Sequence, residues 1–406
     1  MPAPVRFEVG LDGGAHVFAP STHRTPHCAD VDCFSTLVKN RVDVHRTIIL
    51  AMTNAGFAPF WHNLRCSLER LNISQHALII GTDAMACDAA RSSSVPCVVG
   101  SELLWERDDE DAGLSSQSER HGTEAYARLM HIKARPALAV LRLGYDLLFT
   151  DTDLVFLRNP LIELRRPPYG AQLASGTLDV LIQSDYDPSN DVRCRSDGEC
   201  RSTRCFTDSE RCEDEACGGF YLLRAGASAI ALLEALFAQM AWQRVHVDAR
   251  IGEQPALNYV LRHTAGVRYR LLPRALYANG NAYFVHADWP SAGKLPVLVH
   301  NNWLAGFEAK RQRFVDHGMW WAAPSGSARG RLDAQSHHKS TETRHHYSAQ
   351  ELLATGATKE DPLPDGAGVS CIATAVAPPV RGGRSSPPSR GLKERPRRHA
   401  RSSGSS

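Results

Sequence analysis

Residues 141–160 read LRLGYDLLFTDTDLVFLRNP, and the interpretation of the chain starts from this stretch. The mostly apolar residues 145–150 predict a buried strand, and Asp151 and Asp153 follow it directly. In open α/β sheets, ligands bind beyond the carboxyl ends of the strands. Two carboxylates at such a position are costly to desolvate unless a cation or hydrogen bonds compensate them. The stretch therefore predicts a ligand site at the end of a sheet strand.

The two aspartates have the chemistry of a divalent-cation site. Hard oxygen ligands suit Mg²⁺ or Mn²⁺, which can bridge diphosphate oxygens. Alternate residues of an extended segment point to opposite sides, so one carboxylate can bind the ion while the other holds water, ribose or sugar hydroxyls. A D-x-D tripeptide is common by chance. Its position between two apolar segments favours the functional interpretation.

Alternating strands and helices surround this stretch. Residues 47–52 predict a strand, the next segment a helix with Phe60, Leu64 and Leu68 on one face, and residues 77–80 a second strand. Such a β-α-β unit is the element of parallel α/β sheets. A helix that runs through residues 126–130 is expected to restart at Pro136 and to end at Gly144. Further strands are expected at residues 180–183, 219–223 and 296–300, and an apolar helix at residues 227–241.

Charge and missing motifs exclude several function classes. The net charge is +2, but residues 376–406 carry eight Lys and Arg against one acidic residue, which leaves 38 basic and 43 acidic side chains in residues 1–375. A mildly acidic body argues against nucleic acid as a partner, because nucleic-acid binding needs a basic face. The chain also lacks a G-x-G-x-x-G after a strand, a Walker lysine loop, a G-x-S-x-G elbow and H-E-x-x-H.

The patterns divide the chain into three parts. Residues 1–44 show no clear periodicity and are expected to form an irregular lead-in, and residues 45–322 form one α/β domain. Residues 323–406 predict a disordered, basic tail rich in Ser, Pro and Arg. Neither an apolar run of about 18 residues nor a signal-peptide pattern occurs, so membrane contact is expected only through an anchor absent from this sequence or through the basic tail.

The eleven cysteines favour an oxidising compartment. Five of them fall close together, at Cys194, Cys200, Cys205, Cys212 and Cys217. Zinc sites prefer cysteine pairs separated by two to four residues, whereas the separations here are five, four, six and four. The spacing favours a disulfide-stapled loop and leaves a zinc site or reduced thiols as alternatives. One sequon, Asn72-Ile73-Ser74, permits glycosylation, although such tripeptides also arise by chance.

With these motifs the chain resembles nucleotide-diphospho-sugar transferases of glycosyltransferase family 77, which includes plant cell-wall arabinosyl-, xylosyl- and galactosyltransferases. The family pattern LGY…D-x-D…NP is matched by Leu143-Gly144-Tyr145, the two aspartates and Asn159-Pro160. Gly218-Gly219-Phe220-Tyr221 resembles N-x-G-F-Y, with Cys217 at the asparagine, and Glu253, Gln254 and Asn258 resemble D-Q…N, with Glu for Asp. Residues 300–314, HNNWLAGFEAKRQRF, resemble the H-x-N…G…K motif.

The resemblance implies a GT-A-like fold with a mostly parallel sheet, a UDP-sugar donor and a Mn²⁺ or Mg²⁺ cofactor. It implies Asp151, Asp153 and His300 as metal ligands, with Asp151 also able to contact the donor's ribose or sugar. It implies nucleotide or phosphate contacts at Asn54, Asp83, Lys133, Asn302, Lys310 and Arg313. Imidazole suits mid-row metals, and the cationic side chains can neutralise a departing diphosphate.

The implied reaction is sugar transfer to a hydroxyl of a glycan or glycoprotein, with retention of anomeric configuration. Asp151, Asp153, Glu253 and Gln254 are its expected catalytic residues, the last two on the donor sugar's face. The leaving phosphate can deprotonate the acceptor as it attacks from the same face, and a covalent intermediate on Glu253 or Asp185 is the alternative.

Two other functions remain open: a catalytically silent sugar- or nucleotide-binding relative, and a metal-dependent hydrolase of nucleotide sugars. The resemblance further implies the Golgi lumen as the place of action, in line with the cysteine content.

Overall fold

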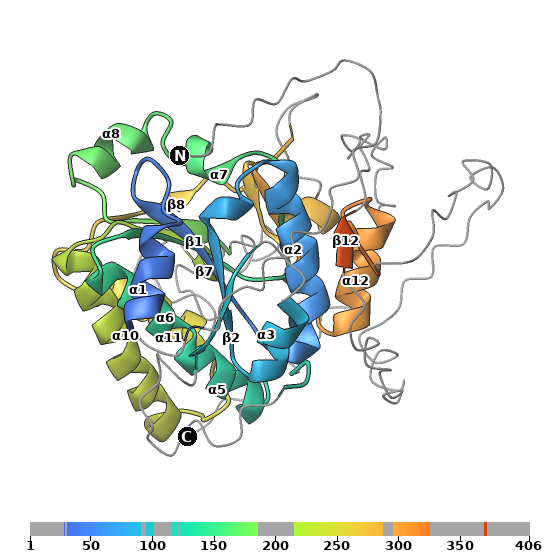
Figure 1. Cartoon of the computed structure of the whole chain (residues 1–406). Coiled ribbons are helices and arrows are strands. Elements are labelled where there is room, and N and C mark those ends of the chain that lie inside the picture. The colour runs from blue at the N-terminus through green and yellow to red at the C-terminus, as the bar shows by residue number, and fades with distance from the viewer. Residues whose placement is uncertain are drawn as a thin grey trace, which may run out of the picture.

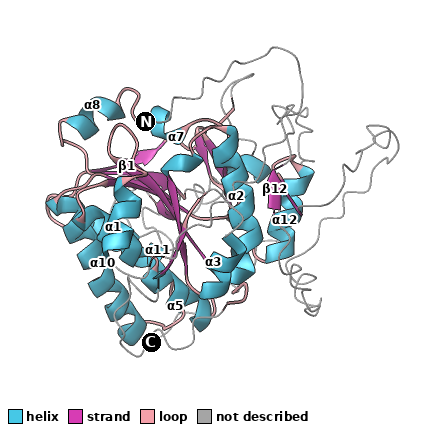
Figure 2. Cartoon of the chain, in the orientation of Figure 1, coloured by secondary structure: helices cyan, strands magenta, loops and turns pink. Residues whose placement is uncertain are grey.

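The computed structural model describes residues 28, 31–90, 95–100, 116–119, 122–185, 215–286, 295–324 and 369–371. Its centre is a seven-stranded sheet with the strand order β3-β2-β1-β4-β7-β6-β8. The strands are β1 (Thr47–Thr53), β2 (Ala77–Gly81), β3 (Cys97–Val99), β4 (Asp146–Thr150), β6 (Val180–Ser184), β7 (Ala216–Leu223) and β8 (Tyr269–Leu272). Neighbours are parallel except around β7, which runs antiparallel to both β4 and β6. The predicted α/β fold with a mostly parallel central sheet is confirmed (Figure 2).

Helices cover both faces of the sheet, because its central strands are apolar on both sides (Figure 1). On β1, Ile48 and Leu50 face one core cluster, and Ile49 and Ala51 face another. The first cluster packs against α1 (Val31–Lys39), α6 (Ala134–Arg142), α10 (Ala227–His246) and α11 (Glu253–His263). The second packs against α2 (Ala58–Arg70) and α3 (Ala84–Ala90). Near-continuous apolar strands are typical of a sheet buried in this way.

The described part of the chain contains further helical elements. They are η1 (Ala55–Phe57), η2 (Ser74–His76), α5 (Glu124–Ile132), α7 (Pro160–Glu163), α8 (Tyr169–Ala174) and η5 (Asn281–Val285). The helix expected to restart at Pro136 restarts at Ala134, directly after α5 ends.

A second, three-stranded sheet brings the C-terminal motif to the first sheet. It consists of β5 (Leu154–Phe156), β10 (Leu298–His300) and β9 (Tyr277–Ala278), in that order. Since β10 runs antiparallel to β5, His300 pairs with Leu154, the residue after Asp153. Helix α12 (Phe307–Asp316) follows β10 and packs on α2 through Phe60 and Phe314. The D-x-D and H-x-N motifs are thus brought together by strand pairing.

Two elements differ from the predicted domain limits. Helix α1 lies in residues 1–44, where an irregular lead-in was expected. Its Phe34 and Val38 are fully buried, and a short amphipathic helix of this kind is stabilised by packing that the sequence alone does not show. Strand β12 (Val369–Cys371) lies within the predicted disordered tail and pairs with β11 (Ala322–Pro324). The rest of that tail lies outside the described residues.

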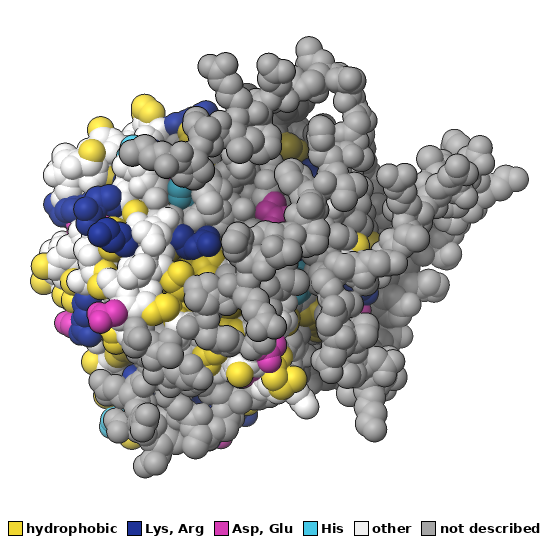
Figure 3. All heavy atoms as spheres, in the orientation of Figure 1, with side chains coloured by type: hydrophobic (Ala, Val, Ile, Leu, Met, Phe, Trp, Pro, Cys, Tyr) yellow, Lys and Arg dark blue, Asp and Glu magenta, His cyan; other side chains and the backbone are white. Residues whose placement is uncertain are grey.

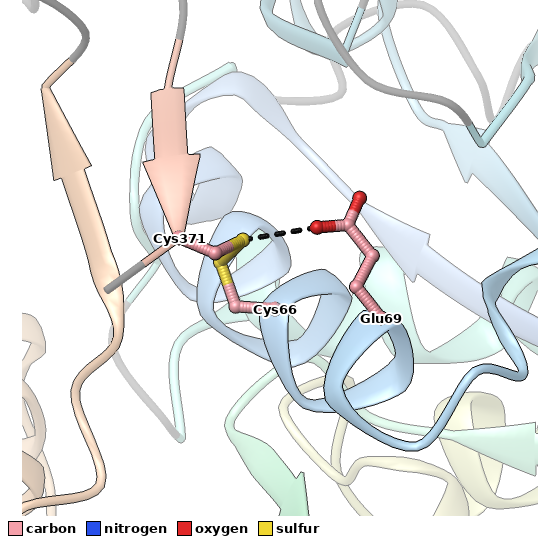
Figure 4. A group of neighbouring side chains, drawn as sticks. All are labelled: Cys66, Glu69 and Cys371. Atoms are coloured by element: carbon pink, nitrogen blue, oxygen red, sulfur yellow. Dashed lines mark hydrogen bonds between the residues drawn. A yellow bond between two sulfur atoms is a disulfide. The ribbon is translucent and has the colours of Figure 1, made fainter. Parts of the chain in front are cut away.

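Three disulfides occur among the described residues: Cys28–Cys33, Cys66–Cys371 and Cys87–Cys97. The Cys66–Cys371 bridge attaches β12 to α2, and the disulfide sulfur of Cys371 lies 3.1 Å from Glu69 Oε2 (Figure 4). This cross-link accounts for the ordered strand in a segment of tail-like composition. Of the five clustered cysteines, Cys217 is a buried free thiol, and the other four lie outside the described residues.

Surface and helix properties complete the description. None of the described helices combines the length and apolarity that crossing a bilayer requires. On the face shown in Figure 3, basic side chains lie in small groups among apolar and acidic ones.

Candidate active site

Four strands of the main sheet end at one edge, and a polar residue follows each of them. Asn54 follows β1, Asp83 lies two residues after β2, Asp151 follows β4 and Asp185 follows β6. The start of the antiparallel β7, at Ala216, lies at the same edge because it pairs with the end of β6. The edge predicted from residues 141–160 therefore collects side chains from segments far apart in the sequence.

The segment around the two aspartates is fixed at both ends. Gly144 ends α6 with a φ of 79°, a left-handed conformation that glycine adopts without strain. Asn159 caps α7 by accepting hydrogen bonds from the backbone amides of Leu161 and Ile162, and Pro160 occupies the first helical position. These backbone requirements explain the glycine of LGY and the NP of the matched pattern.

Asp151, Asp153 and His300 converge at this edge. One ligand atom from each lies within 4.8 Å of the others. The Nε2 atom of His300 is 3.3 Å from Asp153 Oδ1 and 3.8 Å from Asp151 Oδ2. Two carboxylates and an imidazole form a donor set that suits Mn²⁺.

The orientation of His300 is set by Gln183. The Oε1 atom of this fully buried glutamine lies 2.9 Å from His300 Nδ1, and its Nε2 donates to the carbonyl of Tyr277 at 3.2 Å. Since the amide nitrogen is used by Tyr277, the amide oxygen faces the imidazole and accepts from Nδ1–H. The lone pair of Nε2 then faces the two carboxylates, which is the arrangement found where a metal-ligating histidine is held by a hydrogen-bond acceptor.

Glycine at position 219 is required for this convergence. A Cβ atom there would lie 2.2 Å from His300 Cε1 and 2.7 Å from Asp151 Oδ2. At Gly218, a Cβ atom would come within 3.0 Å of Glu253 Oε1. Gly218 and Gly219 are therefore the positions at which the backbone of β7 packs against Glu253, Asp151 and His300.

Two lysines pair with the two aspartates. Lys133 Nζ, almost completely buried, lies 2.8 Å from Asp151 Oδ1 and 2.7 Å from Glu253 Oε1. Lys310 Nζ, on α12, lies 2.5 Å from Asp153 Oδ2 and is more exposed. Burial by itself would lower the pKa of Lys133, but Asp151 and Glu253 hold that pKa well above its ordinary value. Burial would raise the pKa of Asp153, but the Lys310 ammonium group holds it far below its usual range. Lys133 and Asp153 are therefore both charged at neutral pH.

Asp185 organises a second polar network beside the first. Its Oδ2 atom accepts from Gln254 at 2.8 Å, and its Oδ1 atom accepts from Asn302 at 3.0 Å and from Trp303 at 2.9 Å. Burial raises the pKa of Asp185 against the effect of these donors. The Cys217 thiol lies 3.6 Å from His300 Nδ1 and 3.7 Å from the Asn302 amide, between the two networks.

Asn54 and Asp83 lie side by side at the ends of β1 and β2. Asn54 Oδ1 accepts from the backbone amide of Phe57, and its Nδ2 donates to the carbonyl of Gln117 at 2.5 Å. Asp83 accepts from the backbone amides of Ala55 and Ala86. In this conformation both side chains hold the loops that follow their strands.

The remaining predicted residues make protein contacts as well. Asn302 Oδ1 accepts from Gly280 N, and Arg313 donates to the backbone carbonyl of Asn302 and to the side chain of Asn301. Asn258 bonds both backbone groups of Ala216 and so joins α11 to β7.

Gln183 and Trp303 were not predicted from the sequence. Gln183 gave a signal, since it is a polar residue within the apolar run 180–183 of a buried strand. Trp303 gave none, because its contact with Asp185 depends on a φ of 58° that no pattern indicates.

Residues 72–314 match the family described as nucleotide-diphospho-sugar transferase. A UDP-galactose:fucoside alpha-3-galactosyltransferase of Dictyostelium discoideum is 24% identical over 302 residues, which cover 67% of this chain and 43% of that protein. A UDP-D-xylose:L-fucose alpha-1,3-D-xylosyltransferase of Arabidopsis thaliana is 25% identical over 290 residues, which cover 69% of this chain and 70% of that protein. Mouse xyloside xylosyltransferase 1, a solved structure, has 14% identity and a TM-score of 0.37 over 63% of this chain and 98% of its own.

The family match spans the D-x-D stretch, the strand that carries His300 and most of α12, including Lys310. It also spans every strand of the central sheet except β1. The chain therefore belongs to the nucleotide-diphospho-sugar transferase family, a family of glycosyltransferases, as the motifs in its sequence predicted.

Proposed function

We propose that the chain is a metal-dependent glycosyltransferase that moves a sugar from a UDP-sugar to a hydroxyl of a glycan or glycoprotein and retains the anomeric configuration. One observation carries the metal dependence. The carboxylates of Asp151 and Asp153 and the Nε2 lone pair of His300 point at a common position. Lys133 and Lys310 pair with Asp151 Oδ1 and Asp153 Oδ2, whereas the other two carboxylate oxygens, Asp151 Oδ2 and Asp153 Oδ1, face His300 Nε2. A cation between these electron-rich atoms would offset their mutual repulsion.

The residues present fit a divalent ion of the Mn²⁺ type. Asp153 and His300 are its proposed direct ligands, and Asp151 contacts the ion, directly or through water, or the donor's ribose. Bound there, the ion would supply positive charge for the diphosphate oxygens of the donor. Gln183 keeps the imidazole in the tautomer that a metal ligand needs.

Lys310 is the proposed phosphate contact of the protein itself. Its ammonium group reaches Asp153 from α12 and keeps 17% of its side-chain surface exposed. A small rotation of a flexible lysine can bring this charge from the carboxylate to a donor phosphate. Lys133 has only 4% of its side chain exposed and two acidic partners, so its contribution is to hold Asp151 and Glu253 in place.

The transfer step requires only that the protein orient the donor and stabilise developing charge. The bond from the sugar's anomeric carbon to the diphosphate oxygen breaks, and the acceptor oxygen bonds to the same face of that carbon. The acceptor's proton moves to the departing phosphate oxygen, while Glu253 and Gln254 lie beside the positive charge that develops on the sugar ring.

A covalent intermediate on Glu253 or Asp185 is the alternative to this step. Both carboxylates already bind other side chains: Glu253 pairs with Lys133, and both oxygens of Asp185 accept hydrogen bonds.

Proton NMR of the first-formed product would establish the stereochemistry, and an α-linked donor should give an α-linked product.

The uridine and ribose are assigned to the edge formed by Asn54 and Asp83. These residues follow β1, which is next to β4 in the sheet, and β2, which is next to β1. A nucleotide at their end of the edge would extend its diphosphate toward Asp151. Asn302 lies on the other side, where Asp185 fixes its amide, and is placed to contact a phosphate or a sugar hydroxyl.

The Golgi lumen is the proposed compartment. Three disulfides, one of them closing a separation of 305 residues, form and persist in oxidising compartments and are rare in the cytosol.

A panel of UDP-sugars with Mn²⁺ tests the function. UDP-galactose and UDP-xylose with fucoside acceptors come first, because the two relatives are named for these donors and for transfer to fucose. We expect UDP release, protection against thermal unfolding by the donor, and complete loss of turnover in EDTA with recovery on adding Mn²⁺. A silent binding relative would be protected without releasing UDP, and a hydrolase would release UDP but transfer sugar to no acceptor.

A further inference from the structure

Asn72 opens the one N-x-S/T sequon in the sequence, Asn72-Ile73-Ser74. It lies just beyond the end of α2, in the turn that leads into η2 and then into β2. The side chain is exposed, that of Ser74 is half-buried, and Ile73 between them is buried. The acceptor amide of the tripeptide therefore faces solvent, while its middle residue anchors the turn.

The turn is a Schellman motif. The backbone amide of Asn72 donates to the carbonyl of Glu69, and that of Ile73 donates to the carbonyl of Leu68. Ile73 and Leu68 belong to the same core cluster, which supplies the hydrophobic contact of this motif. Asn72 has a φ of 54°, and asparagine is one of few residues that adopt this conformation readily.

This geometry alone gives asparagine a structural reason to occur at position 72. The hydrogen bonds of the turn use only the backbone of Asn72, including the carbonyl that accepts from Gln75. Its side-chain amide is left for another use. The αL requirement also does not explain Ser74, which completes the sequon two residues later.

The position is compatible with a large modification. Asn72 precedes the start of β2, whereas the candidate active site lies beyond the other ends of β1, β2 and β4. The five residues of β2 separate the two by roughly 15 Å, at about 3.3 Å per residue. A glycan at Asn72 would therefore leave the donor and acceptor paths open.

The disulfides supply an independent reason to expect the modifying enzyme. A chain that forms the Cys28–Cys33, Cys66–Cys371 and Cys87–Cys97 bridges folds in an oxidising compartment. N-glycosylation of exposed sequons takes place in the secretory pathway.

We propose that Asn72 carries an N-linked glycan. In its attachment, the side-chain nitrogen of Asn72 bonds to the anomeric carbon of an oligosaccharide supplied as a lipid diphosphate. The bond from that carbon to the phosphate oxygen breaks, the lipid diphosphate leaves, and the amide loses one proton. The proposal rests on the compartment proposed above and is independent of the transferase reaction.

Mass spectrometry of the full chain purified from its native cells tests this directly. We expect one peptide-N-glycosidase-sensitive modification, with Asn72 converted to aspartate by the enzyme. An unmodified Asn72 in protein whose disulfides are formed would overturn the proposal, and so would a chain whose cysteines are reduced and whose Asn72 is bare. Neither result depends on whether the protein transfers sugar.

Matched variants separate the glycan from the helix cap. Ser74→Ala should lose the modification while keeping the turn, and Ser74→Thr should retain it. Asn72→Gly should lose the modification without strain, because glycine also adopts a positive φ. Asn72→Gln should lose the modification and also strain the helix cap, so this variant should melt at a lower temperature. A modification that persists in Ser74→Ala would contradict an N-linked glycan at this sequon.

Discussion

The two lysine–aspartate pairs of the site have the same chemistry and different surroundings. Lys133 and Asp151 form the inner pair, where the lysine also binds Glu253 and is almost inaccessible. Lys310 and Asp153 form the outer pair, next to His300 and on the exposed helix α12. A lysine that is buried between two acidic partners serves to hold those side chains in place, whereas a partly exposed lysine with one partner can exchange it when a ligand arrives. We therefore propose that the inner lysine mainly positions Asp151 and Glu253 and that the outer one binds the donor.

The largest expected effect is at the outer carboxylate. Asp153→Ala should lower the rate of UDP-sugar turnover by at least about 10²–10³, because removing one preorganised electrostatic group typically costs that much. Asp151→Asn should also reduce the rate severely, and His300→Ala should raise the Mn²⁺ concentration required. UDP release with Mn²⁺ titration measures all three.

Folding should survive Asp153→Ala, since this carboxylate contributes little to core packing. Asp316→Ala, a change to an exposed aspartate on α12, is the control and should leave the rate unchanged. A normal rate for Asp153→Ala, or activity that persists in EDTA, would remove the metal from the proposal.

Replacing each lysine by methionine should distinguish the two pairs, because one variant should lose mainly stability and the other mainly turnover. Lys133→Met leaves Asp151 and Glu253 without their cation, so we expect a loss of about 3 kcal/mol in the free energy of unfolding, at the lower end for a broken buried pair because Asp151 is partly exposed. Lys310→Met should cost less stability than Lys133→Met, because Lys310 has one acidic partner and Lys133 has two, and should lower turnover by about 10²-fold.

Urea unfolding measures the stability of Lys133→Met and Lys310→Met, and UDP release measures their turnover. Lys39→Met, at the exposed end of α1, gives the baseline for losing a lysine charge. Equal loss of stability in the two site variants would show that the distinction between the pairs is wrong.

The sequence predicted most of the fold because its strands are bounded, apolar runs and the first β-α-β unit follows standard periodicity. It also placed Asp151 and Asp153 correctly after their strand. It missed α1 and β12, whose order comes from tertiary packing and from a disulfide between residues 305 apart. No local pattern contains that information.

The prediction of the site was limited in the same way. The motifs indicated His300, but they could not show that Gln183 holds it or that Asp185 joins Gln254 to Asn302, because these contacts cross between β6, α11 and the loop after β10. Lys133 was predicted as a donor contact. The structure places it between two acids, and its part in donor binding stays a prediction.

A substitution at Gln183 tests whether Mn²⁺ binding beside the outer pair depends on the orientation and tautomer of His300. Gln183→Leu removes the acceptor of His300 Nδ1, so the imidazole loses its preferred tautomer and we expect about 10–100-fold weaker Mn²⁺ binding. Electron paramagnetic resonance of bound Mn²⁺ measures the affinity without any turnover. Nitrogen-15 chemical shifts of His300 should report the loss of a single tautomer.

Asn63→Leu is the matched control for this experiment. Asn63 is another fully buried amide with two hydrogen bonds, to Met319 and Trp321, and it contacts none of the proposed ligands. We expect it to lower stability while leaving Mn²⁺ affinity unchanged. If both variants weaken Mn²⁺ equally, Gln183 acts through general destabilisation.

The smallest effect is expected at Cys217, which lies between the two networks and stands where the resembled family has asparagine. Its thiol lies 3.6 Å from His300 Nδ1 and 3.7 Å from the Asn302 amide, and burial raises its pKa well above the ordinary value, so it remains a neutral thiol. Cys217→Ala should therefore keep turnover within about fivefold of the unmodified protein, the equivalent of about 1 kcal/mol for a weak hydrogen bond. Steady-state UDP release decides this, with Cys217→Asn measured in parallel. A decrease in turnover of about 10²-fold in Cys217→Ala would show that the thiol contributes to the reaction. Turnover that appears only in Cys217→Asn would instead support the silent-relative alternative, since restoring the family residue would then restore the reaction.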